Sequence, residues 1–172
     1  MIEVRRIKSD QIEPIRNWRN SQRNILRQNH IISKEEQENY FKKEVWPQDT
    51  LLDPRQILRS ICIDKKLVGY GGLTNIDWPN KRAELSFLLK NEIEEGTQLY
   101  SDIMSEFIQI FVDKFVRNKL HRLFTETYEF REKHIEVLEK NKFVREGRLR
   151  DHIYKDKIFY NSIIHGRIIS EK

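Results

Sequence analysis

Hydrophobic and polar positions alternate with two different periods along the chain, which indicates that both strands and helices are present. A short alternating run at 2–7 predicts a strand, and apolar residues at helical spacing predict a helix over 10–20. Ser33, followed three residues later by Glu36, forms a capping-box pattern. It predicts the start of a second helix, which we expect to end before Pro47. Two helices are therefore expected after the first strand.

The rest of the chain alternates between strand-like and helix-like patterns. Three strand-like runs, separated by short turns at Lys65-Lys66 and at 78–80, predict an antiparallel meander. These runs and the later elements are expected as strands at 55–64, 67–77, 82–89 and 121–128, helices at 97–116 and 131–141, and a terminal hairpin at 143–154 and 158–168. The long connection between the strands at 82–89 and 121–128 implies that these two are parallel, whereas the other strand pairs are antiparallel.

The length and composition favour one globular domain over residues 1–172. Of the 172 residues, 38% are hydrophobic and 34% are charged, which is typical of a chain with a substantial core. No apolar run is long enough for a membrane span, and the N-terminus lacks the apolar segment of a secretory signal. The single cysteine, Cys62, can form no internal disulfide. These features predict a cytoplasmic protein without a membrane partner.

The charge pattern further restricts the binding partners that we expect. The net charge is +5, but basic residues are spread along the chain with acidic residues between them. Basic and aromatic residues do not alternate as they do in a stacking platform for nucleic acid, so we expect no nucleic-acid partner. The five histidines and the one cysteine show no zinc-ligand spacing, and we expect no metal.

Four stretches carry a family resemblance: LVGYGGLTNID, AELSFLL, KLHRLFTETY and VLEKNKFVREGRLRDHIY. With the order of elements, they resemble the GNAT superfamily of N-acetyltransferases over nearly the whole chain. The last stretch is the most specific, because the residues from Val137 to Lys140, Phe143 and Gly147 match the family pattern, while Lys142 replaces its usual glycine. The match points to the branch of ribosomal-protein and amino-sugar acetyltransferases. The opening IRNWRNS and LRQNHIISKEEQENYF is similar to enzymes that act on nucleotide-linked amino sugars.

The resemblance implies a fold and a reaction. The fold is α+β in three layers: a mixed, mostly antiparallel seven-stranded sheet flanked by about four helices, with the parallel strands 82–89 and 121–128 splayed apart. The implied reaction moves an acetyl group from acetyl-CoA to a primary amine of a small molecule, first of all an amino sugar or a nucleotide-linked amino sugar. A protein N-terminus is the alternative acceptor. A non-catalytic binding or scaffold module that has lost CoA is a second alternative, and a homodimer is an open alternative to a monomer.

The resemblance also implies where CoA binds. Unpaired main-chain groups of Phe87, Leu88 and Leu89 would hold the pantetheine arm between the splayed strands. Gly96, Thr97 and Gln98, at the start of the helix 97–116, occupy the place of the pyrophosphate loop. This loop lacks the family's glycine pair and its leading Arg or Gln, and the chain from Asn91 through Asp113 has six acids and no Lys or Arg. We expect Arg131 on the next helix to offset part of the repulsion between these acids and the phosphates.

Catalytic and acceptor residues follow from the same resemblance. Glu84 is the first choice for the base that removes a proton from the amine, with Glu126 as the second choice. Glu84 could equally be a strand glutamate in a surface ion pair, and for Glu126 a surface role is the favoured alternative. The family's proton-donating tyrosine is replaced by Leu138, so solvent or Tyr128 must take that role. The candidates on the acceptor side are Trp18, Arg19, Asn20, Arg27, His152 and Tyr154. The arginine forks suit a diphosphate or a carboxylate, whereas the spacing of Trp18 also fits a buried helix face.

Overall fold

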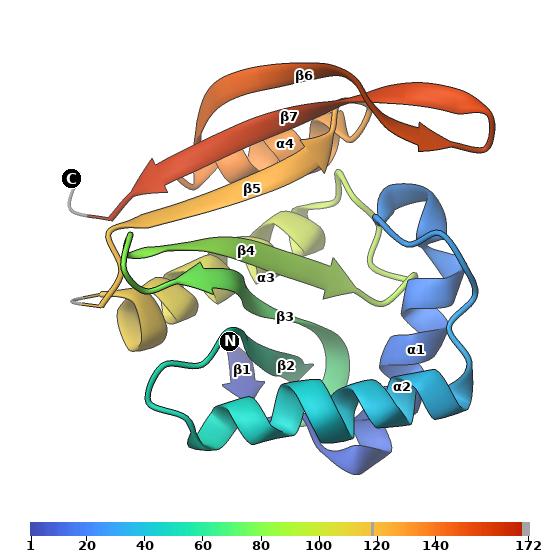
Figure 1. The fold of residues 1–172 in the computed structure, drawn as a ribbon, viewed down its shortest axis with the longest axis vertical. Helices are drawn as coiled ribbons and strands as arrows, with labels where there is room; N and C mark the ends of the chain where they lie inside the picture. The colour runs from blue at the N-terminus through green and yellow to red at the C-terminus, as the bar shows by residue number, and fades with distance from the viewer. Residues whose placement is uncertain (118, 170–172) are drawn as a thin grey trace.

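The computed structural model describes residues 1–117 and 119–169. Within them, seven strands form one sheet in the order β1-β2-β3-β4-β5-β7-β6 (Figure 1). The strands are β1 Ile2–Arg5, β2 Ile57–Ile63, β3 Lys66–Asp77, β4 Arg82–Leu89, β5 Arg122–Tyr128, β6 Val144–Lys155 and β7 Ile158–Ile168. Only β4 and β5 pair in parallel, and all other neighbours are antiparallel. The predicted α+β architecture is confirmed.

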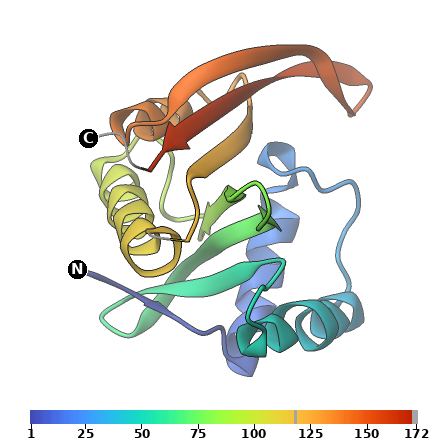
Figure 2. The same cartoon turned by 60° about the vertical axis from the view of Figure 1, so that its left-hand side comes forward.

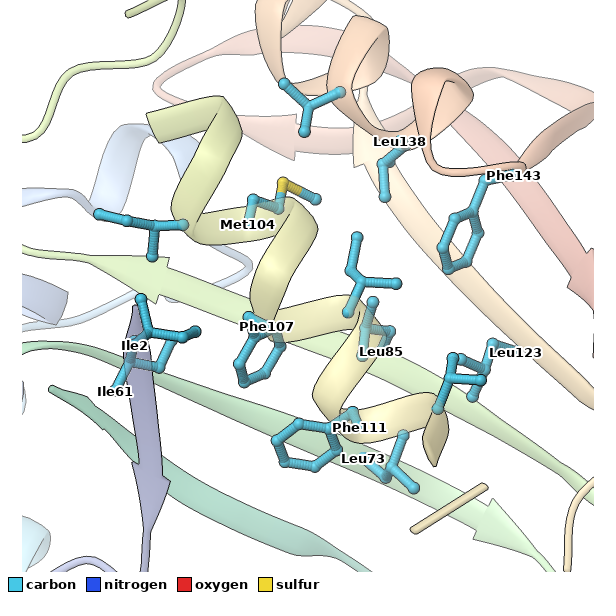
Figure 3. Close-up of a cluster of buried hydrophobic side chains, with 14 of the residues drawn as sticks. Ile2, Ile61, Leu73, Leu85, Met104, Phe107, Phe111, Leu123, Leu138 and Phe143 are labelled. Carbon is cyan, nitrogen blue, oxygen red and sulfur yellow. The ribbon is translucent and has the colours of Figure 1, made fainter. Parts of the chain in front are cut away.

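Helices cover both faces of the sheet, and Figure 2 shows the sheet between them. The helices are α1 Ile12–Ser21, α2 Lys34–Tyr40, α3 Gln98–Phe111 and α4 Glu132–Lys140. On one face, α1 and the segment after α2 pack a small apolar cluster around Ile15 and Phe41. On the other face, α3 and α4 pack the main core (Figure 3). There, α3 presents Met104, Phe107 and Phe111 to the sheet as one buried stripe, as its apolar spacing predicts.

The centre of the sheet diverges where the parallel pair begins to separate. β4 and β5 are in register over only three residues, from Arg82 opposite Arg122 to Glu84 opposite Phe124. Beyond Glu84 the two strands are no longer paired, and Figure 1 shows β5 with the β6–β7 hairpin leaning away from β4. The splayed geometry implied by the sequence is therefore present, and it opens the sheet toward the C-terminal ends of both strands.

The glycine-rich run in β3 lets the neighbouring strands approach closely. A Cβ atom at Gly71 would lie 2.4 Å from the carbonyl oxygen of Ser86, and one at Gly72 would lie 1.9 Å from that of Ile57. Only a residue without a side chain fits at these positions. The register of β3 against β4 then shifts between Thr74 and Asp77, and Asn75 adopts a positive φ of 48° in this irregular stretch.

Three local features differ from the sequence predictions. Pro47 does not end the second helical segment, because the chain continues through a π-helical turn at Phe41–Val45 into a 3-10 helix at Trp46–Thr50, where proline fits in the first turn. The β2–β3 turn has its two positive-φ residues at Asp64 and Lys65, one position earlier than predicted. Between the first two helices, where the sequence predicts no regular element, residues Arg23–Ile25 form a 3-10 turn. No helix in the described ranges is long and apolar enough to cross a bilayer.

Candidate active site

Glu84 lies at the point where β4 and β5 separate, and its carboxylate is almost fully buried, with the residue 5% exposed. Arg27 Nη2 donates a hydrogen bond to Oε1 of Glu84. Asn75 Nδ2 donates to Oε2 over 2.7 Å. The irregular stretch of β3 is what directs the Asn75 side chain toward β4. Both carboxylate oxygens are therefore held, which fixes the direction in which Glu84 faces.

Two hollows meet at Glu84. The first lies in the gap between β4 and β5 and is lined by Phe87, Tyr128, Arg131 and His134 among others. The second lies between α1 and the end of α2. Its lining includes Arg19, Leu26, Arg27, Tyr40, Tyr70, Thr74, Asn75, Glu84 and Ser86. Leu26, Arg27, Thr74, Glu84 and Ser86 line both hollows. A molecule in one hollow could therefore meet a molecule in the other beside a buried carboxylate.

The segment from Gln22 to Gln28, which follows α1, covers the gap. Gln22 Nε2 donates to the carbonyl oxygen of Leu89 over 2.8 Å, and the Tyr128 hydroxyl donates to that of Leu26 over 3.3 Å. From the far hairpin, Lys155 Nζ donates to the carbonyls of Arg23, Leu26 and Gln28. Burial lowers the pKa of Lys155. Residues from three parts of the sequence thus hold this segment over the two strands.

Asn20 and Arg19 also organise this covering segment. The Asn20 side chain accepts hydrogen bonds from Gln28 Nε2 and from the main-chain N–H of Ile32, and donates to the Ile32 carbonyl, each over 2.9 Å. Arg19 Nε donates to Oε1 of Gln28 over 3.2 Å. The side chain of Asn20 therefore bonds only to the loop after α1 among the described residues, whereas Arg19 also lines the second hollow.

The other acceptor-side candidates are spread over different surroundings. Trp18 packs against the small apolar cluster around Ile15, as its spacing allowed. His152 Nε2 lies 3.6 Å from Oε1 of Glu126, which lines the first hollow. Tyr154 is 61% exposed and packs against Phe159 at the tip of the β6–β7 hairpin. Thus Arg19, Arg27 and Glu84 come together around one hollow, while Trp18 and Tyr154 lie away from it.

The two carboxylates of the first hollow share one arginine. Arg27 Nη1 donates to Oε2 of Glu126 over 3.3 Å while its other terminal nitrogen contacts Glu84. The Arg27 side chain remains 49% exposed, in contrast to both glutamates. Oε1 of Glu126 is buried and has no hydrogen-bond partner within the described residues. Arg27 is thus a half-exposed cation between two mostly buried carboxylates.

The start of α3 has the predicted position but a different charge arrangement. Gly96 adopts a φ of +87° and precedes Thr97, whose side chain caps α3 by accepting from the Tyr100 main-chain N–H. Arg131 does not point a free charge at this loop. Its Nε donates over 3.0 Å to Oε1 of Glu95, and its side chain is only 9% exposed. Arg131 thus neutralises one acid of the loop.

Two lysines of α4 approach the same helix start. Lys133 and Lys140 line a shallow hollow with Gly96, Thr97, Gln98 and Glu136, and Lys133 Nζ donates to Oε1 of Glu136 over 2.8 Å. Main-chain N–H groups at a helix N-terminus attract anions, and lysine side chains add to that attraction. Lys140 forms no ion pair within the described residues, so it could hold the anionic end of CoA beside the helix start.

Two tyrosines near the gap are held in their protonated form. Burial raises the pKa of Tyr128, whose ring stacks on Phe130 with centroids 5.3 Å apart. Burial also raises the pKa of Tyr100, whose hydroxyl oxygen lies 2.7 Å from Nδ1 of His134. Leu138, at the position of the family's tyrosine, is fully buried in the main core. Within residues 1–117 and 119–169, no group of three His, Cys, Asp or Glu side chains could hold a metal ion.

Comparison with known proteins decides the family. The profile described as an acetyltransferase (GNAT) domain matches residues 4–164. The chain belongs to the GNAT acetyltransferases. Family membership makes it an acyl-CoA-dependent N-acetyltransferase by class, as the sequence patterns imply.

Solved GNAT structures share the fold at low sequence identity. A spermidine N-acetyltransferase from Vibrio cholerae in complex with CoA and spermine superimposes with a TM-score of 0.83 at 16% identity, covering 98% of this chain and 96% of the other. The ribosomal-protein acetyltransferase RimL in complex with CoA gives 0.82 at 15% identity, covering 99% and 96%. No curated protein sequence matches the chain. At these identities, the likeness supports the GNAT fold alone.

Several residues of this GNAT site had no signal in the sequence. Gln22, Asn75 and Lys155 act through contacts between segments far apart in the chain. A left-handed asparagine beside a strand irregularity is a recognisable feature of Asn75, but only once the register is known. Tyr100 and His134 stand on two different helices, and their contact depends on how those helices pack.

Replacing Lys155 with Met should loosen the segment that covers the gap. The ammonium group donates to three carbonyls, and its loss should lower the free energy of unfolding by about 1 to 2 kcal/mol. Urea unfolding measures this change, and amide hydrogen exchange should become faster at residues 23–28. Lys157→Met, in the exposed turn beside it, is the matched control. Unchanged exchange in Lys155→Met would show that Lys155 does not anchor the segment.

Proposed function

We propose that this GNAT protein transfers an acetyl group from acetyl-CoA to a primary amine, with Glu84 as the base. The observation that carries the proposal is the buried carboxylate at the junction of the two hollows. In the transfer, the amine nitrogen bonds to the acetyl carbon, the carbon–sulfur bond breaks, and its electron pair leaves with the sulfur. The proton that the amine loses goes to Glu84 and then to solvent.

The gap between β4 and β5 supports this assignment on the CoA side. The Leu89 carbonyl faces the gap, where it accepts from Gln22, whereas the Lys90 N–H donates to Val68 at the β3 side. Because main-chain groups alternate in direction along a strand, those of Phe87 face the gap and those of Leu88 face β3. Of the three residues expected to contact the pantetheine arm, Phe87 is thus the one that offers free main-chain groups, and Leu89 offers them if Gln22 moves away.

The second hollow supports an acceptor that carries negative charge or many hydroxyl groups. Arg19 lines this hollow and forms no ion pair within the described residues. Its guanidinium, next to Tyr40, Tyr70 and Asn75, suits a diphosphate or a polyhydroxylated ring. We therefore propose a nucleotide-linked amino sugar as the acceptor. A polyamine would bring further positive charge toward Arg19 and Arg27.

A protein N-terminus is the second candidate acceptor. Glu84 and Glu126 together hold a cation, the Arg27 guanidinium, at the entrance to the first hollow. An α-ammonium group could take the same place if Arg27 moved out.

Tyr128 is the candidate proton donor to the sulfur. It lines the first hollow with a protonated hydroxyl, which would be available if it released the Leu26 carbonyl.

Replacing Glu84 with Gln should remove the base while keeping the shape of the site. We expect kcat to fall by about 10²- to 10⁴-fold, because a positioned general base contributes roughly that much. Steady-state kinetics at saturating acetyl-CoA measure it, with far-UV circular dichroism as a control for folding. Glu126→Gln is the matched variant and should have the smaller effect. If both variants lowered kcat equally, Glu84 and Glu126 would act together as the base. If neither lowered kcat, the proposed mechanism would be refuted.

The acceptor class can be read from one variant of Arg19. Arg19→Ala should lower kcat/KM for a sugar-nucleotide amine by about 10-fold or more, since a charge-assisted hydrogen bond is worth roughly 1.5 to 3 kcal/mol. For a neutral alkylamine, kcat/KM should stay the same. The measurement is an acceptor panel containing a nucleotide-linked amino sugar, a peptide with a free N-terminus and spermidine. Turnover of the peptide or of spermidine alone would reject the amino-sugar acceptor.

Charge variants at the start of α3 should change CoA affinity in opposite directions. Glu95→Gln removes an acid and frees Arg131, so it should tighten CoA binding several-fold. A Lys133→Met, Lys140→Met double variant should weaken it by a similar factor, and Lys43→Met on the opposite face should change nothing. Isothermal titration calorimetry with CoA measures all three. If millimolar CoA neither binds the parent protein nor raises its melting temperature, the chain is a GNAT-fold module that has lost CoA.

A further inference from the structure

Tyr100 and His134 form a buried hydrogen-bonded pair between α3 and α4. The Tyr100 hydroxyl lies 2.7 Å from Nδ1 of His134, and the two residues are only 4% and 6% exposed. Burial lowers the pKa of His134 well below its usual value, and the nearby charges of Arg131 and His165 act in the same direction. His134 is therefore a neutral imidazole, with one nitrogen that donates and one that accepts.

The Tyr100 hydroxyl decides which nitrogen of His134 carries the hydrogen. Burial raises the pKa of Tyr100, so its hydroxyl keeps a proton that it can donate to Nδ1 across the 2.7 Å contact. With the hydroxyl as donor, the hydrogen of the neutral imidazole is on Nε2. This nitrogen makes no hydrogen bond within the described residues, and His134 lines the hollow between β4 and β5. The buried side chain of His134 thus places a nitrogen without a hydrogen-bond partner among the described residues at the proposed CoA hollow.

Glu84 and His134 take different positions relative to the two hollows. Glu84 lines both of them, whereas His134 lines the hollow of the strand gap and is absent from the lining of the acceptor hollow. An amine that attacks from the acceptor hollow would lose its proton on the Glu84 side. If the thioester lies in the gap, its carbon–sulfur bond would break in the hollow that His134 lines.

We propose that the Nε2–H group of His134 donates a hydrogen bond to the CoA sulfur as negative charge develops on it, and that Tyr100 is the positioning residue that fixes this tautomer. The inference rests on the proposed acetyl transfer. His134 moves no proton in this step, because it starts and ends as a neutral donor. A donor placed in a site with little water stabilises developing charge more strongly than it would in bulk solvent.

The first experiment determines the tautomer in the protein without ligand. Nitrogen-15 NMR of the imidazole should show a protonated Nε2 and a hydrogen-bonded, unprotonated Nδ1 at neutral pH. Tyr100→Phe should remove the hydrogen-bond shift at Nδ1 and allow both tautomers, whereas a merely structural Tyr100 would leave the tautomer unchanged. A protonated Nδ1 or a charged imidazole in the parent protein would overturn the proposal.

The second experiment measures the pKa of the bound CoA thiol from the ultraviolet absorbance of the thiolate. His134→Leu should raise this pKa by about 1 and lower kcat by about 10-fold, because one hydrogen bond to the charged sulfur is lost. The KM for acetyl-CoA should change little. His134→Gln keeps an amide donor and should restore part of both quantities. The control is His121→Leu, at an exposed position, which should have the same thiol pKa and kcat as the parent.

The outcomes separate the inference from the proposed function. If the parent binds CoA and transfers acetyl groups, but His134→Leu leaves the thiol pKa and kcat unchanged, His134 has no role at the sulfur and the proposed function stands. If the parent does not bind CoA in calorimetry, the proposed function fails, and the assignment of His134 fails with it.

Discussion

The site depends on one constraint, which is that buried main-chain groups need hydrogen-bond partners. β4 and β5 are central strands, yet they pair over only three residues before they separate. The main-chain groups beyond that point lose their usual partners in the sheet. The chain itself satisfies part of this need, because Gln22 reaches the Leu89 carbonyl from the segment after α1. The main-chain groups of Phe87, beyond Glu84 on β4, face the same gap and have no partner on β5.

Charge inside the site is balanced by pairs that also shape it. Arg131 neutralises Glu95 at the start of α3, and Arg27 bridges Glu84 and Glu126 at the junction of the hollows. Each pair joins elements that the sheet alone does not hold together. Arg27 comes from the segment that covers the gap, so the same contact that neutralises Glu84 also places this segment. The acids that first appear unsuited to a phosphate site are in this way partly compensated from α4.

The sequence predicted the elements well but the contacts poorly. The strands and the four main helices lie within a few residues of their predicted ranges, because the hydrophobic period, the Ser33 cap and the short polar turns are local signals. The position of Glu84 followed from the family resemblance. Its partner Arg27 lies 57 residues away, and the partner of Arg131 lies 36 residues away on another element. Such pairs depend on how helices pack against the sheet, for which no local pattern exists.

The same reasoning explains why Trp18 and Arg19, adjacent in the sequence, have different surroundings. On α1, successive residues point in directions about 100° apart, since the helix has 3.6 residues per turn. Trp18 therefore joins the apolar cluster beneath the helix, while Arg19 reaches the hollow beside Tyr70. Because Trp18 packs against the sheet, the next residue, Arg19, lies at the edge of the contact between helix and sheet. Arg19 at this edge lines the same hollow as the buried Glu84 and forms no ion pair within the described residues, because its position on the helix turns it away from the apolar cluster.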